Sequence, residues 1–192
     1  MKGLILYYSN TGNTKLACEY IARKVQNINF ELYNIVNAEV PDLEPYTLVG
    51  MATFTNFLTV SSIVKDFIDK IPPQNGKYAF VFNSYGNLSG KTLKVLGDLL
   101  SNRGFRITAG HSLHMPESFP PLVAMGIASK GSPNGRELNA FKKFIGELDK
   151  IALGLKEGRE IPLAEIKISW WSRLIPQLPR DLPRRWMGRK YV

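Results

Sequence analysis

Six small polar residues stand between a short apolar segment and a stretch with helical periodicity. Three of them carry hydroxyl groups, two carry amides, and one glycine permits a tight backbone turn. The first N–H groups of a following helix have no partner inside that helix, so together with these side chains they form a site suited to an anion. A helix cap needs only one such residue, and six in a row therefore indicate a phosphate-binding loop. The residues are Ser9, Asn10, Thr11, Gly12, Asn13 and Thr14.

Regular elements must position this loop, and the chain alternates short apolar runs with longer amphipathic stretches. The pattern predicts a doubly wound α/β fold: a three-layer sandwich around a five-stranded parallel sheet in the order 2-1-3-4-5. Ligands of such sheets bind outside the carboxyl ends of the strands, beside the reversal in strand order, where this loop lies. Strands are expected at residues 3–8, 30–36, 46–52, 78–83 and 106–113, and the main helices at residues 13–26, 60–71, 91–102 and 135–155.

The segment from Ile5 to Ile21 resembles the N-terminal signature of the flavodoxin family, an apolar strand followed by Ser or Thr, then Thr-Gly-Asn-Thr and a helix. The six loop residues match that signature position by position. The resemblance implies a flavodoxin-like fold and a loop that binds the 5′-phosphate of FMN. Cys18 stands where the signature usually has alanine, and its small size indicates a core position.

Two later loops also follow apolar strands, and the resemblance implies that they flank the isoalloxazine ring of FMN. Aromatic faces can stack on the ring, and loop N–H groups can bond to its nitrogen and oxygen atoms. Phe54, Phe57 and Tyr85 are the stacking candidates, with Phe57 alternatively beginning the core face of the next helix. The first loop comprises Thr53, Phe54, Thr55, Asn56 and Phe57, and the second comprises Asn83, Ser84, Tyr85, Gly86 and Asn87.

The resemblance implies an FMN-binding electron-transfer protein, in which the cofactor supplies one- or two-electron chemistry and no acid–base pair or nucleophile is needed. Two alternatives stay open: an NAD(P)H:quinone-type flavin reductase, and a flavin-free binding module that docks through its basic C-terminal segment. One cysteine and two histidines exclude a four-ligand zinc or iron–sulfur site built from this chain alone. His111 and His114 have no acidic residue or thiolate spaced near them, so we expect them in a loop or in the core.

The formal charge of +9 is unevenly distributed along the 192 residues. We expect a flavodoxin-like FMN-binding domain at residues 1–166. Residues 167–192 form a tail with seven basic residues, one acidic residue and all three tryptophans. This tail is expected either to pack across the domain or to dock on an acidic redox partner or an anionic membrane surface. Nucleic acid is not expected as a partner, because no RNA- or DNA-binding module accompanies the charge.

Residues 110–121 resemble a flavodoxin subgroup in which the domain is fused to a ferredoxin-like module with two four-iron clusters. That resemblance implies a redox partner of the ferredoxin type, either a separate protein or a module that has been lost. The sequence shows no signal peptide, and its apolar runs are far shorter than the roughly 18 to 20 residues of a membrane span. We therefore expect a cytoplasmic protein.

Overall fold

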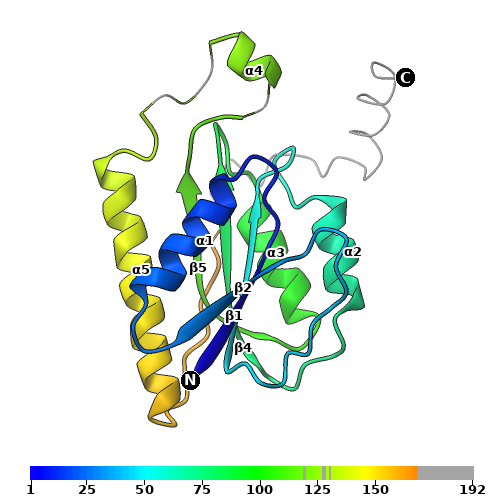
Figure 1. The fold of residues 1–192 in the computed structure, drawn as a ribbon, viewed down its shortest axis with the longest axis vertical. Helices are drawn as coiled ribbons and strands as arrows, with labels where there is room; N and C mark the ends of the chain where they lie inside the picture. The colour runs from blue at the N-terminus through cyan, green and yellow to red at the C-terminus, as the bar shows by residue number, and fades with distance from the viewer. Residues whose placement is uncertain (119, 127–128, 130, 168–192) are drawn as a thin grey trace.

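The fold is a parallel sheet with helices on both of its faces (Figure 1). The computed structural model describes residues 1–118, 120–126, 129 and 131–167. The five strands all run parallel, in the order β2-β1-β3-β4-β5. The predicted fold class and strand order are confirmed. The strands are β1 (Lys2–Tyr7), β2 (Asn29–Asn34), β3 (Leu48–Phe54), β4 (Tyr78–Tyr85) and β5 (Arg106–His114).

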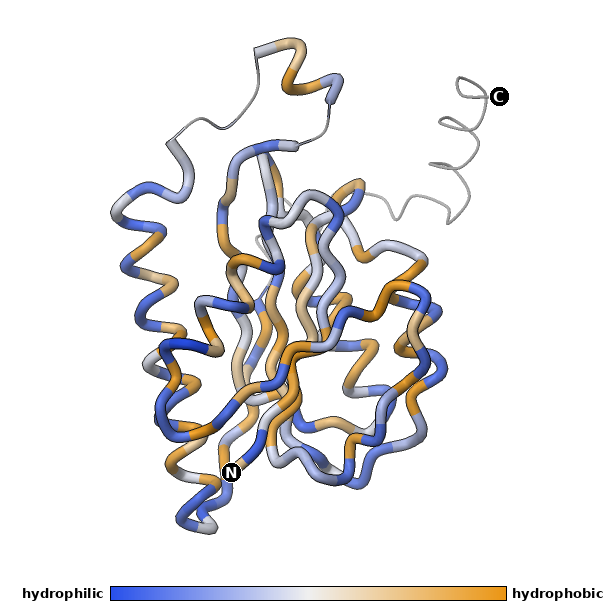
Figure 2. Tube along the Cα trace, in the orientation of Figure 1, coloured by the Kyte–Doolittle hydropathy of each residue, from blue (hydrophilic) through white to orange (hydrophobic). Residues whose placement is uncertain are grey.

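The central strands β3 and β4 are buried along nearly their whole length and are mostly apolar, because the sheet is covered on both sides. Successive side chains point to opposite faces, so Ile5 and Phe80 enter one buried cluster while Leu4 and Val81 enter another. Figure 2 shows apolar residues running along these strands at the centre of the molecule. This double burial anchors the strands and fixes where their carboxyl ends, and hence the loops, emerge.

Helices α1 and α5 cover one face of the sheet, and α2 and α3 cover the other. Cys18 lies fully buried on α1, as expected, and burial raises the pKa of its thiol. Helix α2 begins later than the apolar pattern predicts, since Ser61 caps it by accepting a hydrogen bond from the Val64 N–H. The helices are α1 (Asn13–Lys24), α2 (Ser62–Lys70), α3 (Thr92–Ser101), α4 (Pro120–Ala124) and α5 (Gly135–Lys156).

The short helix α4 was not predicted, and it lies beyond the carboxyl end of β5 in Figure 1. It buries none of its residues, so it leaves no core-facing periodicity in the sequence. A connection of this length after β5 is unusual for a compact domain, and long connections of this kind often carry function.

The chain after α5 turns back along the edge strand β5. The Ala164 N–H donates to the Ile107 carbonyl at 2.8 Å, and Ile166 packs on the cluster beneath α3. These contacts cover part of an edge that would otherwise be open to pairing. The tail expected at residues 167–192 lies, beyond Lys167, outside the described residues. Of the helices in the described part of the chain, none combines the length and apolar composition of a membrane span.

Candidate functional site

The loops after β1, β3 and β4 surround one cavity of about 640 Å³ at the carboxyl ends of the strands. This volume falls in the range of small-molecule sites, about 300–1,000 Å³. Thirteen of the sixteen residues predicted to hold a cofactor line it. They are Ser9, Asn10, Thr11, Asn13, Thr14, Phe54, Thr55, Asn56, Phe57, Ser84, Tyr85, Gly86 and Asn87.

The other three predicted residues, Gly12, Thr53 and Asn83, do not line the cavity. Thr53 and Asn83 are fully buried beneath it. The Asn83 amide donates to Thr55 Oγ1 at 2.9 Å and accepts from Ser112 Oγ at 2.6 Å. Asn83 therefore connects the loop after β3 to β4 and β5. It holds that loop in position and does not itself face the cavity.

Gly12 is the N-cap of α1 and has a φ of +94°. Residues other than glycine rarely adopt this left-handed backbone conformation. Its own N–H donates to Ser9 Oγ at 3.1 Å, which closes a tight turn. Among the described residues, no side chain caps α1 or α3, whereas Ser61 caps α2 and Asn134 caps α5. Within that part of the chain, the polar residues of the loop are therefore not used as a helix cap, and no side chain accepts from the first N–H groups of α1 beside the cavity.

Hydrogen bonds join this loop to two other segments. Thr14 and Ser84 share a buried bond of 2.9 Å between their hydroxyl oxygens, which links α1 to the end of β4. The Asn13 amide donates to the Pro116 carbonyl at 3.1 Å, and Thr11 Oγ1 donates to Ser118 Oγ at 3.1 Å. The cavity is thus formed by the loops after the three parallel strands β1, β3 and β4, together with the segment after β5.

That fourth segment, after β5, supplies lining residues that sequence reasoning missed. The predicted topology already indicated this segment, because β5 ends at the same edge of the sheet as β1, β3 and β4. Glu117 Oε2 accepts from the Asn87 amide at 2.8 Å, and a methyl group on Gly86 would lie 2.3 Å from the same oxygen. The missed lining residues of this segment are Met115, Pro116, Glu117, Ser118, Pro120 and Leu122.

The three aromatic candidates occupy different positions at the cavity. Phe54 packs on Tyr8, with ring centroids 5.1 Å apart. Phe57 is 37% exposed at the tip of the turn between Asn56 and Thr59, before α2 begins, so it does not start the core face of that helix. Tyr85 is half-buried, and burial, followed by the charge of Glu137, raises the pKa of its phenol.

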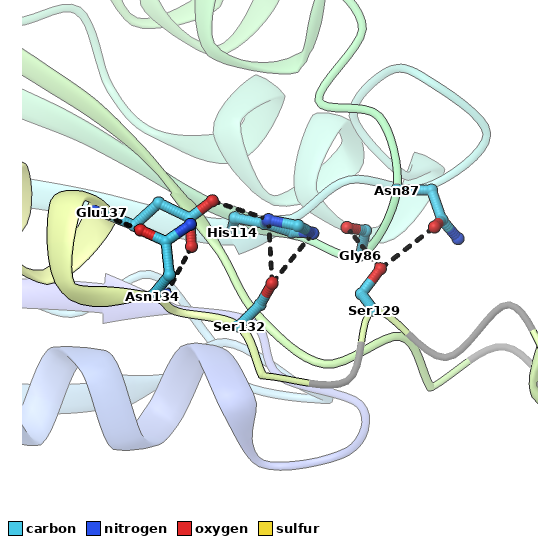
Figure 3. Close-up of polar contacts among 7 residues, drawn as sticks. All are labelled: Gly86, Asn87, His114, Ser129, Ser132, Asn134 and Glu137. Atoms are coloured by element: carbon cyan, nitrogen blue, oxygen red, sulfur yellow. Dashed lines mark hydrogen bonds and ion pairs between the residues drawn. The ribbon is translucent and has the colours of Figure 1, made fainter.

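His114 has an acidic neighbour that sequence spacing did not indicate. Its Nδ1 lies 2.8 Å from Glu137 Oε1 and 2.9 Å from Ser132 Oγ (Figure 3). The Asn134 N–H and then His114 hold the pKa of Glu137 below its usual range. Ser132 Oγ also lies 3.3 Å from Nε2 of His114, so the serine hydroxyl contacts both ring nitrogens, while the carboxylate contacts Nδ1.

His111 lies in an aromatic cluster with Phe82, Phe141 and Phe144. Burial there lowers the pKa of His111 to about 4. This histidine is therefore a neutral core residue, in agreement with the expectation from sequence. Among the described residues, no group of three or more His, Cys, Asp or Glu side chains is placed to hold a metal ion.

Comparison with known proteins places this architecture among flavin-domain folds. Residues 4–95 match the family model described as "Flavodoxin domain". An uncharacterized protein of Methanocaldococcus jannaschii, MJ0298, is 30% identical over 147 residues, which are 75% of this chain and 95% of that protein.

Similar solved structures agree on the fold. A flavodoxin from the domain Archaea has a TM-score of 0.59 at 18% identity, covering 80% of this chain and 99% of its own. The Streptococcus pneumoniae flavodoxin gives 0.59 at 16% identity, covering 79% and 99%. Rubredoxin oxygen:oxidoreductase from Desulfovibrio gigas gives 0.61 at 19% identity over 81% of this chain and 36% of that longer one. The match of residues 4–95 to the flavodoxin-domain model, which includes the signature strand and its loop, and the flavodoxin fold together show that this chain belongs to the flavodoxin family.

Proposed function

We propose that this protein binds FMN in the cavity at the carboxyl ends of its strands and acts as an electron-transfer protein. The observation that carries the proposal is the uncapped N-terminus of α1, which faces a cavity of about 640 Å³ through a loop of hydroxyl and amide side chains. Unpaired N–H groups and small donors favour a phosphate, and they do so without a lysine.

The donor set of the site fits FMN at both of its ends. The phosphate would lie against the loop of residues 9–14, whose left-handed turn at Gly12 leaves open space around the Cα atom. The ring system would lie between the loops after β3 and β4, where Tyr85 offers an aromatic face and the cavity wall is largely apolar. When bound, FMN supplies the one- and two-electron chemistry, and the protein binds and orients it.

The mouth of the cavity suits a carrier that exchanges electrons with another protein. Phe57 and Leu88 line it and are 37% and 64% exposed. Exposed apolar side chains around a cofactor allow close approach of a partner surface. We propose a redox partner of the ferredoxin type, with acidic groups that would face the basic tail, because residues 167–192 hold seven basic residues and one acidic residue.

FMN titration of the flavin-free protein tests the proposal. Quenching of FMN fluorescence should saturate at one FMN per chain, and riboflavin, which lacks the phosphate, should bind more weakly. Failure to quench FMN would refute the proposal.

A negative charge introduced into the loop separates phosphate binding from general affinity for the flavin. Asn10→Asp places a carboxylate on the exposed phosphate loop and should weaken FMN binding by about tenfold or more, with little effect on riboflavin. Asn102→Asp makes the same change at the exposed C-terminal end of α3 and is the matched control. Equal effects of the two variants on FMN affinity would refute a phosphate site at residues 9–14.

Turnover distinguishes the carrier from a reductase. A carrier should accept electrons only from a separate reductase. Steady oxidation of NAD(P)H in the presence of a quinone, by the FMN-loaded protein alone, would show that it is a flavin reductase instead.

A further inference from the structure

Residues 116–118, in the segment after β5, bond to two different loops of the cavity. Two of these residues bond to the loop of residues 9–14. The Pro116 carbonyl accepts from the Asn13 amide, and Ser118 Oγ accepts from Thr11 Oγ1, each at 3.1 Å. The residue between them bonds to the loop after β4. The segment therefore connects the loop proposed for the phosphate with a loop proposed for the ring system.

Glu117 makes the contact with the loop after β4. Its Oε2 accepts from the Asn87 amide at 2.8 Å, and its Oε1 accepts from the Ser118 N–H at 2.9 Å. The residue also packs directly on the backbone at Gly86, where an added Cβ atom would lie 2.3 Å from Glu117 Oε2 and 3.0 Å from its Cα. Two hydrogen bonds and this close approach hold the carboxylate in one orientation.

Asn87 is bonded on its other side as well. An ionised carboxylate can only accept hydrogen bonds, so Nδ2 of Asn87 faces Glu117 and Oδ1 faces away from it. Ser129 Oγ lies 3.0 Å from this Oδ1 and 3.1 Å from the Gly86 carbonyl oxygen (Figure 3). Both of these oxygens are acceptors, so the serine hydroxyl is the donor. Asn87 thus bonds to the connection between β5 and α5 on both sides of α4, at Glu117 before it and at Ser129 after it.

The backbone at Ser129 supports this arrangement. Its φ is +48°, a left-handed conformation that residues other than glycine rarely adopt. Such conformations persist where surrounding contacts hold them, and they often occur at functional sites. The hydrogen bonds to Gly86 and Asn87 are contacts of this kind.

The connection held by Asn87 supplies part of the cavity wall. Pro120 and Leu122 of α4 line the cavity, although α4 buries none of its residues. Because α4 has no buried face to fix its position, the bonds on either side of it have a direct effect on this part of the wall.

We propose that Asn87 is a positioning residue for the FMN site: its amide clamps Glu117 and Ser129, and this clamp keeps residues 116–118 and α4 in place as one wall of the cavity. The inference rests on the proposed function. It gives Asn87 a different role from direct binding of the ring, because both polar atoms of its amide already bond to protein groups. A wall that is ordered in advance favours binding, since less ordering remains when the ligand arrives.

An exchange of the two side-chain types tests the clamp through FMN dissociation constants. Asn87→Asp brings a second carboxylate against Glu117 and should weaken FMN binding by about tenfold, because side chains in direct contact couple strongly. In the Glu117→Gln background, the same substitution should change the constant by less than about twofold, since the glutamine amide donates to the new carboxylate. The double variant also keeps an acceptor for Ser129 and for the Ser118 N–H.

The two backgrounds separate a clamp from direct contact with the ligand. Asn87→Asp adds the same negative charge beside the cavity in both, so repulsion of FMN contributes equally to both comparisons. Equal weakening in the two backgrounds would show that Asn87 acts on the ligand itself, and it would overturn the inference. Asn102→Asp, at the exposed C-terminal end of α3, is the matched control and should leave FMN affinity unchanged in both backgrounds.

Hydrogen exchange in the flavin-free protein gives a readout that does not depend on the cofactor. The Met115 N–H donates to the Tyr85 carbonyl at 2.8 Å, where the connection leaves the sheet. It should exchange severalfold faster in Asn87→Asp than in the wild type, and at nearly the wild-type rate in the double variant. The Val25 N–H, at the end of α1, should exchange alike in all of these proteins. A wild-type exchange rate of Met115 in Asn87→Asp would overturn the inference.

The two proposals fail in different ways. Absence of FMN binding by the wild type would refute the proposed function, and the exchange rates would still test the clamp. FMN binding by the wild type, with equal weakening by Asn87→Asp in both backgrounds, would refute only the positioning role of Asn87.

Discussion

Replacing Gly12 by alanine isolates the left-handed turn that begins α1. Gly12 has a φ of +94°, and an added methyl group would meet nothing within 4 Å. Gly146, within α5, is exposed and also has nothing within 4 Å of an added methyl group, but it has ordinary helical geometry. The two substitutions add the same atoms to open space, so their difference measures backbone conformation alone.

The expected changes in stability have opposite signs. A left-handed conformation costs an L-residue about 1–2 kcal/mol, so Gly12→Ala should lower the free energy of unfolding by about that amount. Alanine is favoured over glycine within a helix by about 0.5–1 kcal/mol, so Gly146→Ala should raise it. At about 2–4 °C per kcal/mol for a chain of this size, the melting temperatures of the two variants should differ by several degrees.

Urea denaturation followed by circular dichroism measures both effects, and FMN titration measures the consequence for the site. If alanine at position 12 relaxes the turn, the N–H groups at the start of α1 are redirected and FMN binds about tenfold more weakly, while Gly146→Ala binds as the wild type does. Wild-type stability and wild-type FMN affinity in Gly12→Ala would refute the argument that this turn requires glycine.

Three further predictions concern buried polar groups and helix ends. Thr14→Val removes the buried bond to Ser84 and should cost about 1–2 kcal/mol in urea denaturation, whereas Thr14→Ser, which keeps the hydroxyl, should cost less. His111 has a pKa of about 4 in the folded protein, below the ordinary histidine value of 6.5, so the unfolded state binds the proton more readily. Stability should therefore fall as the pH drops from about 6.5 to about 4, by at most about 3 kcal/mol, and His111→Phe should abolish this part of the pH dependence. Asn134→Ala removes the capping box of α5 and should lower the melting temperature by an amount equivalent to about 1 kcal/mol, while Asn134→Ser should restore most of it; no loss in the alanine variant would contradict the role of the cap.

Much of the fold could be predicted because its signals are local. Each apolar run that predicts a strand becomes one, and the helical spacing of residues 135–155 corresponds to α5, Gly135–Lys156. The boundaries of α2 differ because the cap at Ser61, and not the first apolar residue of the stripe, determines where the helix begins. Helix α4 could not be predicted, since a helix that buries no residue leaves no apolar stripe.

The site was predictable in part for the same reason. The phosphate loop joins a strand directly to a helix, so its residues, their order and their place at the sheet edge all follow from local sequence. The pairing of His114 with Glu137 does not, because the two residues are 23 positions apart and meet only where α5 packs beside β5. Glu117 reaches Asn87 in the same way, across 30 positions.

The sequence alone therefore determined the class of fold, the order of its elements and the loop suited to a phosphate, because hydrophobic period, turn chemistry and a run of small polar residues before a helix act over a few neighbouring residues. The tertiary structure decided the size of the cavity, the contribution of the segment after β5, and the contact between His114 and Glu137 behind Tyr85. Those features depend on which distant segments the packed sheet brings within hydrogen-bonding distance, and no local pattern records that.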